Sequence, residues 1–212
     1  MASRDPVPHT YEALTRDYDA YIFDCDGTLA DSMPLHFEAW RRALSNHEAP
    51  FEFEWDLFVS RAGKTLEVTV HELNQQFESR LDVMAVARLQ REIYAELLPS
   101  VGPIVEVVTL VRELWGRYPL AVASGGDRRT VETTLMNLGI LDAFHTIVTA
   151  EDVAHGKPAP DMFLLAAERM GVAPERCVVF EDSLLGIEGA QRANMGYSLV
   201  KRVSAEGRTG MG

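Results

Sequence analysis

Two aspartates one residue apart, Asp24 and Asp26, are the side chains of this chain best suited to chemistry. They follow the short apolar run 20–23 and enter a turn that begins with Gly27. An unbroken apolar run of this length is typical of a strand buried on both faces of a parallel sheet. Asp24 then lies at the strand's carboxyl end, the edge where open α/β sheets bind ligands. The alternative is an Asx turn, in which a carboxylate only bonds its own backbone.

Other polar residues follow three apolar runs in the carboxyl half of the chain. After run 120–123 come Ser124 and Gly125, after run 146–148 and a short loop comes Lys157, and after run 177–180 come Glu181 and Asp182. Because the carboxyl ends of parallel strands meet at one edge of the sheet, we expect all of these residues to share a site with the two aspartates.

The expected cluster of carboxylates predicts a bound cation. Four carboxylates brought that close repel one another by several kcal/mol at an intermediate dielectric constant. Ligands that are all oxygen favour a hard ion, and a few carboxylates, waters and a substrate phosphate are the usual ligands of Mg²⁺. With Lys157 beside it, such a site accepts a phosphate dianion.

These residue types predict stepwise phosphoryl transfer. Asp24 is the expected nucleophile, which attacks phosphorus to form an acyl phosphate. Asp26, beyond the turn, gives a proton to the leaving oxygen and later takes one from water. Ser124, with backbone N–H groups such as that of Gly125, holds the phosphoryl oxygens, and Lys157 offsets charge on nucleophile and phosphate. Asp182, assisted by Glu181, completes the metal site.

The Asp-x-Asp-Gly-Thr-Leu segment, the serine, the Lys-Pro pair and the Glu-Asp pair resemble, in this order, the four motifs of the haloacid dehalogenase-like hydrolase superfamily. The resemblance runs from about Tyr21 to Gly196. It implies that the metal contacts Asp24, the main-chain carbonyl of Asp26, and Asp182. Segments 157–163 and 179–187 are similar to the β-phosphoglucomutase-like subgroup. Within it, segments 72–75 and 163–172 look most like bacterial fructose-1-phosphate phosphatase-type proteins.

The pattern along the chain predicts an α/β protein with a Rossmann-like parallel sheet core and an inserted small helical cap. After residue 100, strand-like runs alternate with amphipathic helices, as in βαβ units. Residues 32–99 read as nearly continuous helix, bounded by breaks rich in Pro and Gly near residues 31–32 and 99–103. The predicted core therefore comprises residues 1–31 and 100–212, and the cap residues 32–99. The alternative is a helical layer packed on the sheet.

Three residues of the predicted cap are candidates for contact with substrate. His36 follows Asp26 by ten residues, the spacing at which β-phosphoglucomutase-like proteins place a cap histidine that bonds the acid/base aspartate. Arg61 and Lys64 lie in a turn where that subgroup presents its substrate loop. Each also has a plain interpretation as a surface side chain.

Composition limits the compartment and the partners. A chain of 212 residues with 47% hydrophobic content can build one sizeable core and a smaller unit. The net charge of −12 repels phosphate backbones and anionic lipid, so a small phosphorylated metabolite is expected rather than nucleic acid or a membrane. Only Cys25 and Cys177 are present, which favours a reducing compartment. With no signal-like or membrane-spanning segment, a cytoplasmic protein is expected. A monomer is expected because opening and closing of the cap already supplies the motion that the cycle needs.

The expected activity is Mg²⁺-dependent hydrolysis of a small sugar phosphate. The first alternative is a phosphosugar mutase, which shares Asp24, Asp26 and Lys157 and differs in how well the closed cap excludes water. A dehalogenase is disfavoured, because that branch has no use for the second aspartate. A catalytically silent binding module on the same scaffold is the remaining alternative.

Overall fold

Five short strands form a parallel sheet in the order β3-β2-β1-β4-β5. The strands are β1 (Ala20–Phe23), β2 (Leu120–Ala123), β3 (Thr146–Val148), β4 (Cys177–Glu181) and β5 (Gly196–Leu199). The computed structural model describes residues 18–61 and 64–200, so both ends of the predicted core lie outside it. Phe23 of β1 pairs with Val122 on one side and Phe180 on the other. Asp24 therefore leaves the centre of the sheet between the ends of β2 and β4.

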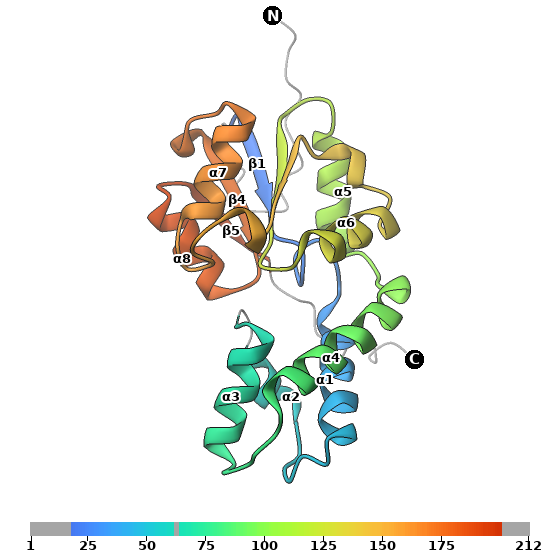
Figure 1. Cartoon of the computed structure of the whole chain (residues 1–212). Helices are drawn as coiled ribbons and strands as arrows, with labels where there is room; N and C mark the ends of the chain where they lie inside the picture. Colours follow the sequence, from blue (N-terminus) through green and yellow to red (C-terminus); the bar gives the residue numbers. More distant parts are fainter. Residues whose placement is uncertain (1–17, 62–63, 201–212) are drawn as a thin grey trace, which may run out of the picture.

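Helices cover both faces of the sheet. Successive side chains of a strand point to opposite faces, so each strand contributes to the apolar cluster on either side. Tyr21 and Phe23 point into one apolar cluster, and Ala20 and Ile22 point into the other. The first cluster is completed by α5 (Val105–Leu114) and α6 (Arg128–Asn137), the second by α7 (Asp161–Met170) and α8 (Leu184–Arg192). Figure 1 shows these pairs on opposite sides of the sheet.

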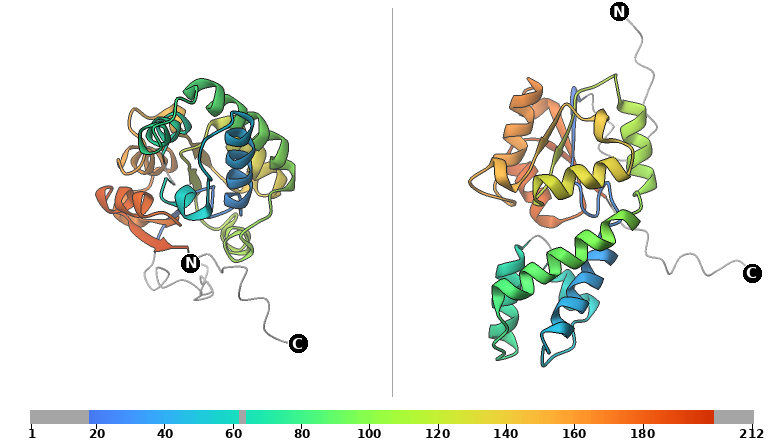
Figure 2. Two further views of the ribbon diagram at one scale, coloured as in Figure 1. Left: turned by 90° about the horizontal axis from the view of Figure 1, so that it is seen from below. Right: turned by 45° about the vertical axis from the view of Figure 1, so that its right-hand side comes forward.

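The remaining α-helices form a group of their own. They are α1 (Met33–Asn46), α2 (Trp55–Val59), α3 (Leu66–Gln76) and α4 (Val83–Leu97). A third apolar cluster, which includes Trp40, Phe53, Leu73 and Val86, is made by these helices and the segments between them. In Figures 1 and 2 the group lies beyond the end of the sheet to which the β1 arrow points. The predicted residue limits of core and cap stay a prediction.

Among the described residues, four single 3₁₀ turns connect the larger elements. They are η2 (Leu98–Ser100), η3 (Leu141–Ala143), η4 (Ala150–Asp152) and η5 (Pro174–Arg176).

The two chain segments that join the helical group to the sheet lie side by side. The Asp31 N–H donates to the Gly102 carbonyl at 2.9 Å, and the Ile104 N–H donates to the Leu29 carbonyl at 2.9 Å. Ala30 forms an isolated antiparallel bridge with Pro103 between these bonds. The connection is therefore narrow and held by backbone hydrogen bonds.

The predicted α/β class with a Rossmann-like parallel sheet is confirmed by this topology. The sequence analysis does not predict β5, because Gly196, Tyr197 and Ser198 make no apolar run. β5 is the edge strand beside β4 and is partly exposed, so its residues are not required to form an apolar run. In the part of the chain described, we find no helix with the length and apolarity required to cross a membrane.

Leu73 provides a test of whether the helical group unfolds as a separate unit. Its side chain is fully buried in the third cluster, so Leu73→Ala should cost about 2 to 5 kcal/mol of stability. We expect hydrogen exchange to accelerate in α1–α4 while the amides of β1 and β4 keep their protection. The matched control is Val68→Ala, at an exposed position of the same helix. Equal acceleration in the strands would mean one cooperative unit.

Candidate active site

A buried lysine joins two carboxylates at the carboxyl end of the sheet. The Lys157 ammonium lies 2.5 Å from Asp24 Oδ1 and 2.6 Å from Glu181 Oε1. Asp24 follows β1 and is 6% exposed, while Glu181 ends β4 and is 1% exposed. The Asp24 N–H donates to the Phe180 carbonyl at 3.0 Å, which fixes the backbone of the two strand ends.

The charges around Asp24 do not balance. Ligand atoms of Asp24, Glu181 and Asp182 lie within 4.8 Å of one another, and one ammonium offsets one of the three carboxylates. Burial, together with the charges of Glu181 and Asp182, raises the pKa of Asp24 despite the nearby lysine. The pKa of Lys157 is raised although burial opposes this, because Asp24 and Glu181 stabilise the ammonium. A cluster of oxygen ligands with unbalanced negative charge fits a hard divalent cation.

Both oxygens of Glu181 are engaged by neighbouring groups. Oε1 accepts from Lys157, and Oε2 accepts from the Ser183 N–H at 2.6 Å and from the Ser183 hydroxyl at 2.8 Å. The next turn carries Gly186, where an added Cβ would stand 1.9 Å from Glu181 Oε1. Glycine is therefore required here because the carboxylate occupies the space of a side chain.

Asp26 lies in a different environment from Asp24. Its Oδ1 accepts from the Ser32 hydroxyl at 2.7 Å and lies 3.5 Å from His36 Nε2 and 3.4 Å from the Tyr94 hydroxyl. Burial alone would raise the pKa of Asp26, but hydrogen bonds from His36 and Ser32 and the charge of His36 outweigh it and lower the pKa. His36 therefore lies beside Asp26 in this structure, and its role in the reaction stays a prediction.

The loop after β2 passes next to Asp26. The Ser124 N–H donates to the Val148 carbonyl at 3.0 Å, and Ser124 Oγ accepts from the Gly126 N–H at 3.1 Å. A Cβ built on Gly126 would stand 3.4 Å from Ser124 Oγ and 3.8 Å from Asp26 Oδ2. Gly125, between them, is exposed and has open space around it. The loop thus offers a hydroxyl and backbone beside the second aspartate.

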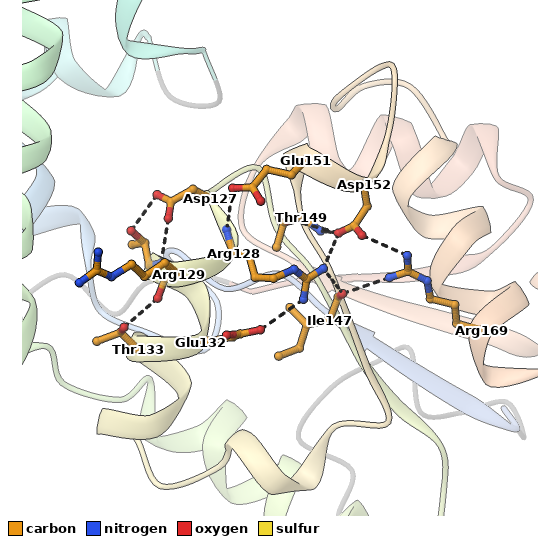
Figure 3. Close-up of polar contacts among 11 residues, drawn as sticks. Asp127, Arg128, Arg129, Glu132, Thr133, Ile147, Thr149, Glu151, Asp152 and Arg169 are labelled. Carbon is orange, nitrogen blue, oxygen red and sulfur yellow. Dashed lines mark hydrogen bonds and ion pairs between the residues drawn. The ribbon is translucent and has the colours of Figure 1, made fainter.

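An ion-pair network joins the loop after β2 to the loop that leads to Lys157. Figure 3 shows Asp152 between Arg128 and Arg169, with bonds of 2.7 Å and 3.0 Å. Asp152 also accepts from the Thr149 N–H and hydroxyl at 2.8 Å and 3.0 Å. Both arginines donate to the Ile147 carbonyl, and the Arg128 N–H donates to Glu151. The network holds the ends of α6, η4 and α7 together.

Among the described residues, Arg61 and Lys64 make their hydrogen bonds and ion pairs with the helical group and not with the Asp24 cluster. Lys64 Nζ is 2.6 Å from Glu72 Oε1, and Arg61 donates to Gln76 and lies 3.9 Å from Glu72 Oε2. These partners are on α3, so both cations are held within the helical group. Their predicted role in substrate binding stays a prediction.

Cys25, between the two aspartates, is buried and free. Burial, and then the charges of Asp26 and Asp24, raise the pKa of its thiol. The thiolate is therefore suppressed, as expected for a residue that packs inward.

Sequence reasoning missed several polar residues that support the predicted ones. Thr28 donates to Asp182 at 3.5 Å, and Ser32, Tyr94, Ser183 and Asp152 make the contacts described above. A signal existed for Ser183, which caps α8 and donates to the carboxylate two residues earlier. Tyr94 is 68 positions from Asp26, and no local pattern connects them.

Comparisons with known proteins agree with the fold. A family model described as haloacid dehalogenase-like hydrolase matches residues 18–194. Fructose-1-phosphate phosphatase YqaB of Escherichia coli is 40% identical over 84% of this chain and 94% of that protein. A phosphorylated carbohydrates phosphatase of Thermotoga maritima is 32% identical over 84% and 82%. The crystal structure of β-phosphoglucomutase from Clostridium difficile superimposes with a TM-score of 0.71 at 24% identity, covering 85% and 83%.

The chain therefore belongs to the haloacid dehalogenase-like hydrolase family. Its family and its phosphatase relatives identify it as a phosphoric monoester hydrolase.

Gly186→Ala tests the close approach of α8 to Glu181. The new methyl group must displace the carboxylate that holds Lys157, so we expect a loss of about 1 to 3 kcal/mol of stability and a marked fall in turnover. Urea unfolding and phosphate release measure the two effects. Gly102→Ala, at a glycine with open space around it, is the control. Wild-type stability in Gly186→Ala would contradict this packing.

The Asp152 network predicts a pH-dependent contribution to stability. Burial would raise the pKa of Asp152, but bonds from Thr149 and the two arginines lower it to about 2. Because the unfolded pKa is about 3.9, the stabilisation is complete above about pH 5 and is lost as pH falls toward 2.

We therefore expect Asp152→Asn to lower the free energy of unfolding near pH 7 by on the order of 1 to 2 kcal/mol, reduced by solvent screening at a side chain that is 16% exposed. Denaturant titrations from pH 2 to 7 should show this difference shrinking toward the acid end. A difference that is constant with pH would assign the effect to packing alone.

Proposed function

We propose that this protein hydrolyses the phosphate monoester of a small sugar through an aspartyl phosphate on Asp24. The observation that carries the proposal is the contrast between two neighbouring carboxylates. Asp24 is bound by the buried Lys157, whereas Asp26 is bound from the side of the helical group by Ser32 and His36. Two carboxylates in such different environments suit the separate roles of nucleophile and acid/base.

The first step transfers the phosphoryl group to Asp24. A carboxylate oxygen of Asp24 attacks phosphorus, the ester P–O bond breaks, and the sugar oxygen takes a proton from Asp26. Ser124 Oγ already accepts from the Gly126 N–H, so its own hydrogen is free to donate to a phosphoryl oxygen. In the second step water attacks phosphorus, Asp26 removes its proton, and inorganic phosphate leaves Asp24.

Asp26 must be protonated before the first step. Its lowered pKa means that the carboxylate is ionised before substrate binds. A phosphate dianion bound beside Asp24 adds negative charge near Asp26 and raises its pKa, which favours proton uptake with substrate in place. The same group is then ready to act as a base once the sugar has left.

Asp24, Asp182 and the main-chain carbonyl of Asp26 would hold Mg²⁺, the ion that suits this oxygen cluster. Mg²⁺ held there would neutralise charge on the carboxylates and on the phosphoryl oxygens. Glu181 belongs to the predicted ligand set, but both its oxygens already accept hydrogen bonds. We propose that it acts by holding Lys157 and the Ser183 turn.

Fructose 1-phosphate is the substrate we propose to test first. Support comes from the 40% identical relative that carries this name, which spans most of both chains. His36, Arg61 and Lys64 belong to the helical group and are the proposed substrate contacts on that side. We also propose that the protein is a cytoplasmic monomer that acts on a small phosphorylated metabolite.

The test is release of inorganic phosphate from a panel of hexose, pentose and triose phosphates. We expect release with Mg²⁺, none with EDTA, and a loss of at least about 10³-fold in Asp24→Asn, because the nucleophile is removed. The matched control is Asp142→Asn. Asp142 lies on η3, before the amino end of β3, whereas the site lies at the carboxyl ends of the strands.

The outcomes separate the competing functions. Metal-dependent release that Asp24→Asn abolishes supports the phosphatase, and the preferred compound tests the sugar. Conversion of a sugar phosphate to its positional isomer without release would favour a mutase. Release that survives in Asp24→Asn would overturn the proposed nucleophile, and no reaction with any compound would favour a silent binding module.

A further inference from the structure

The two oxygens of the Asp26 carboxyl group face different parts of the molecule. Oδ1 faces three side chains: the Ser32 hydroxyl, His36 Nε2 and the Tyr94 hydroxyl. Oδ2 lies on the side of the loop after β2, where a Cβ added to Gly126 would stand 3.8 Å away. The contacts to Oδ1 restrict rotation of the carboxyl group and leave Oδ2 facing the proposed phosphoryl site.

Tyr94 is the member of this set that comes from α4. Its side chain is 5% exposed, and its hydroxyl lies 3.4 Å from Asp26 Oδ1. The tyrosine hydroxyl is the donor in this contact, because a carboxylate oxygen accepts hydrogen bonds. The tyrosine thus acts as a neutral donor to the carboxylate.

The Tyr94 ring also places His36. The two rings are stacked with centroids 3.8 Å apart and an angle of 6° between their planes. His36 lies on α1 and Tyr94 on α4, so the stack connects the first and last helices of the helical group. Loss of the Tyr94 ring would therefore alter two of the contacts to Oδ1, whereas loss of the hydroxyl alone removes one.

Ser32 gives independent support for this arrangement. It occupies the N-cap of α1, yet its side chain makes no capping hydrogen bond and donates to Asp26 instead. Thr65, Asp82, Asp127 and Ser183 do cap their helices. A capping bond is typically worth about 1 kcal/mol, so this helix start is arranged around the carboxylate at a cost to local stability.

We propose that Tyr94 is a positioning residue for the acid/base Asp26. Its hydroxyl and the His36 ring stacked on it hold Oδ1, so that Oδ2 is presented to the oxygen of the leaving group. The inference rests on the proposed function, since it assumes that Asp26 donates a proton to that oxygen.

The test compares two leaving groups in Tyr94→Phe. An alkyl phosphate such as fructose 1-phosphate needs the proton, because a sugar alkoxide is a poor leaving group, whereas 4-nitrophenyl phosphate needs it much less. We expect kcat/KM for fructose 1-phosphate to fall roughly tenfold, mostly through kcat, and that for 4-nitrophenyl phosphate to change less than about twofold. The thermal midpoint should stay near that of the wild type.

Controls separate positioning from general damage. Tyr197→Phe removes a hydroxyl from an exposed tyrosine on β5 and should leave both rates unchanged. Asp26→Asn should show the same selective loss as Tyr94→Phe, but larger. In the double variant Tyr94→Phe with Asp26→Asn, the tyrosine change should cost less than about twofold further, because its target is gone.

Four results would overturn the inference. Equal loss for both substrates, or no loss for either, in Tyr94→Phe would show that the tyrosine does not act through the leaving-group proton. A full tenfold loss in the Asp26→Asn background would show that it acts elsewhere. If Asp26→Asn itself does not distinguish the substrates, the proposed role of Asp26 fails, and the inference fails with it.

Discussion

The ammonium of Lys157, buried between Asp24 and Glu181, is the contact on which the geometry of the site depends. Each carboxylate ends a strand at the centre of the sheet, and their repulsion in a buried setting would push the strand ends apart. The lysine offsets that repulsion, and the two carboxylates in turn raise the pKa of the lysine. Its position is in turn set by Glu181, whose other oxygen is held by Ser183 and whose side chain fills the space left by a glycine on α8.

The second aspartate is kept apart from this balance by its place in the chain. Only one residue separates Asp24 from Asp26, and the turn at Gly27, with φ of 87°, follows Asp26 and precedes α1. Asp26 then meets donors from α1 and α4 rather than Lys157. Opposite shifts follow, with the pKa of Asp24 raised by burial and its acidic neighbours and that of Asp26 lowered by its hydrogen bonds. Two aspartates thus differ in pKa because they have different neighbours.

The sequence predicted the parts of the site that follow strands, and it missed the parts that come from packing. Buried parallel strands appear as short apolar runs, so the polar residue after each run could be assigned to one edge of the sheet, as for Asp24 and Lys157. Tyr94 could not be found in this way, because its contact with Asp26 depends on how α4 packs against α1. Asp152 was also missed, although Thr149, three residues before it, forms a capping box with it. Its contacts with Arg128 on α6 and Arg169 on α7, like the contact of Tyr94 with Asp26, depend on packing that no local spacing encodes.

The narrow connection between the sheet and the helical group lies next to Asp26. Backbone bonds between Asp31 and Gly102 and between Leu29 and Ile104 bring the two connecting segments together. Ser32, one residue beyond this connection, donates to Asp26, and Tyr94 reaches the same carboxylate from the last helix of the group. Any rotation of the helical group about the connection must therefore stretch or break contacts to Oδ1 of Asp26. The position of the helices and the orientation of the acid/base carboxyl group are linked by these hydrogen bonds, which a motion that admits substrate would have to break and re-form.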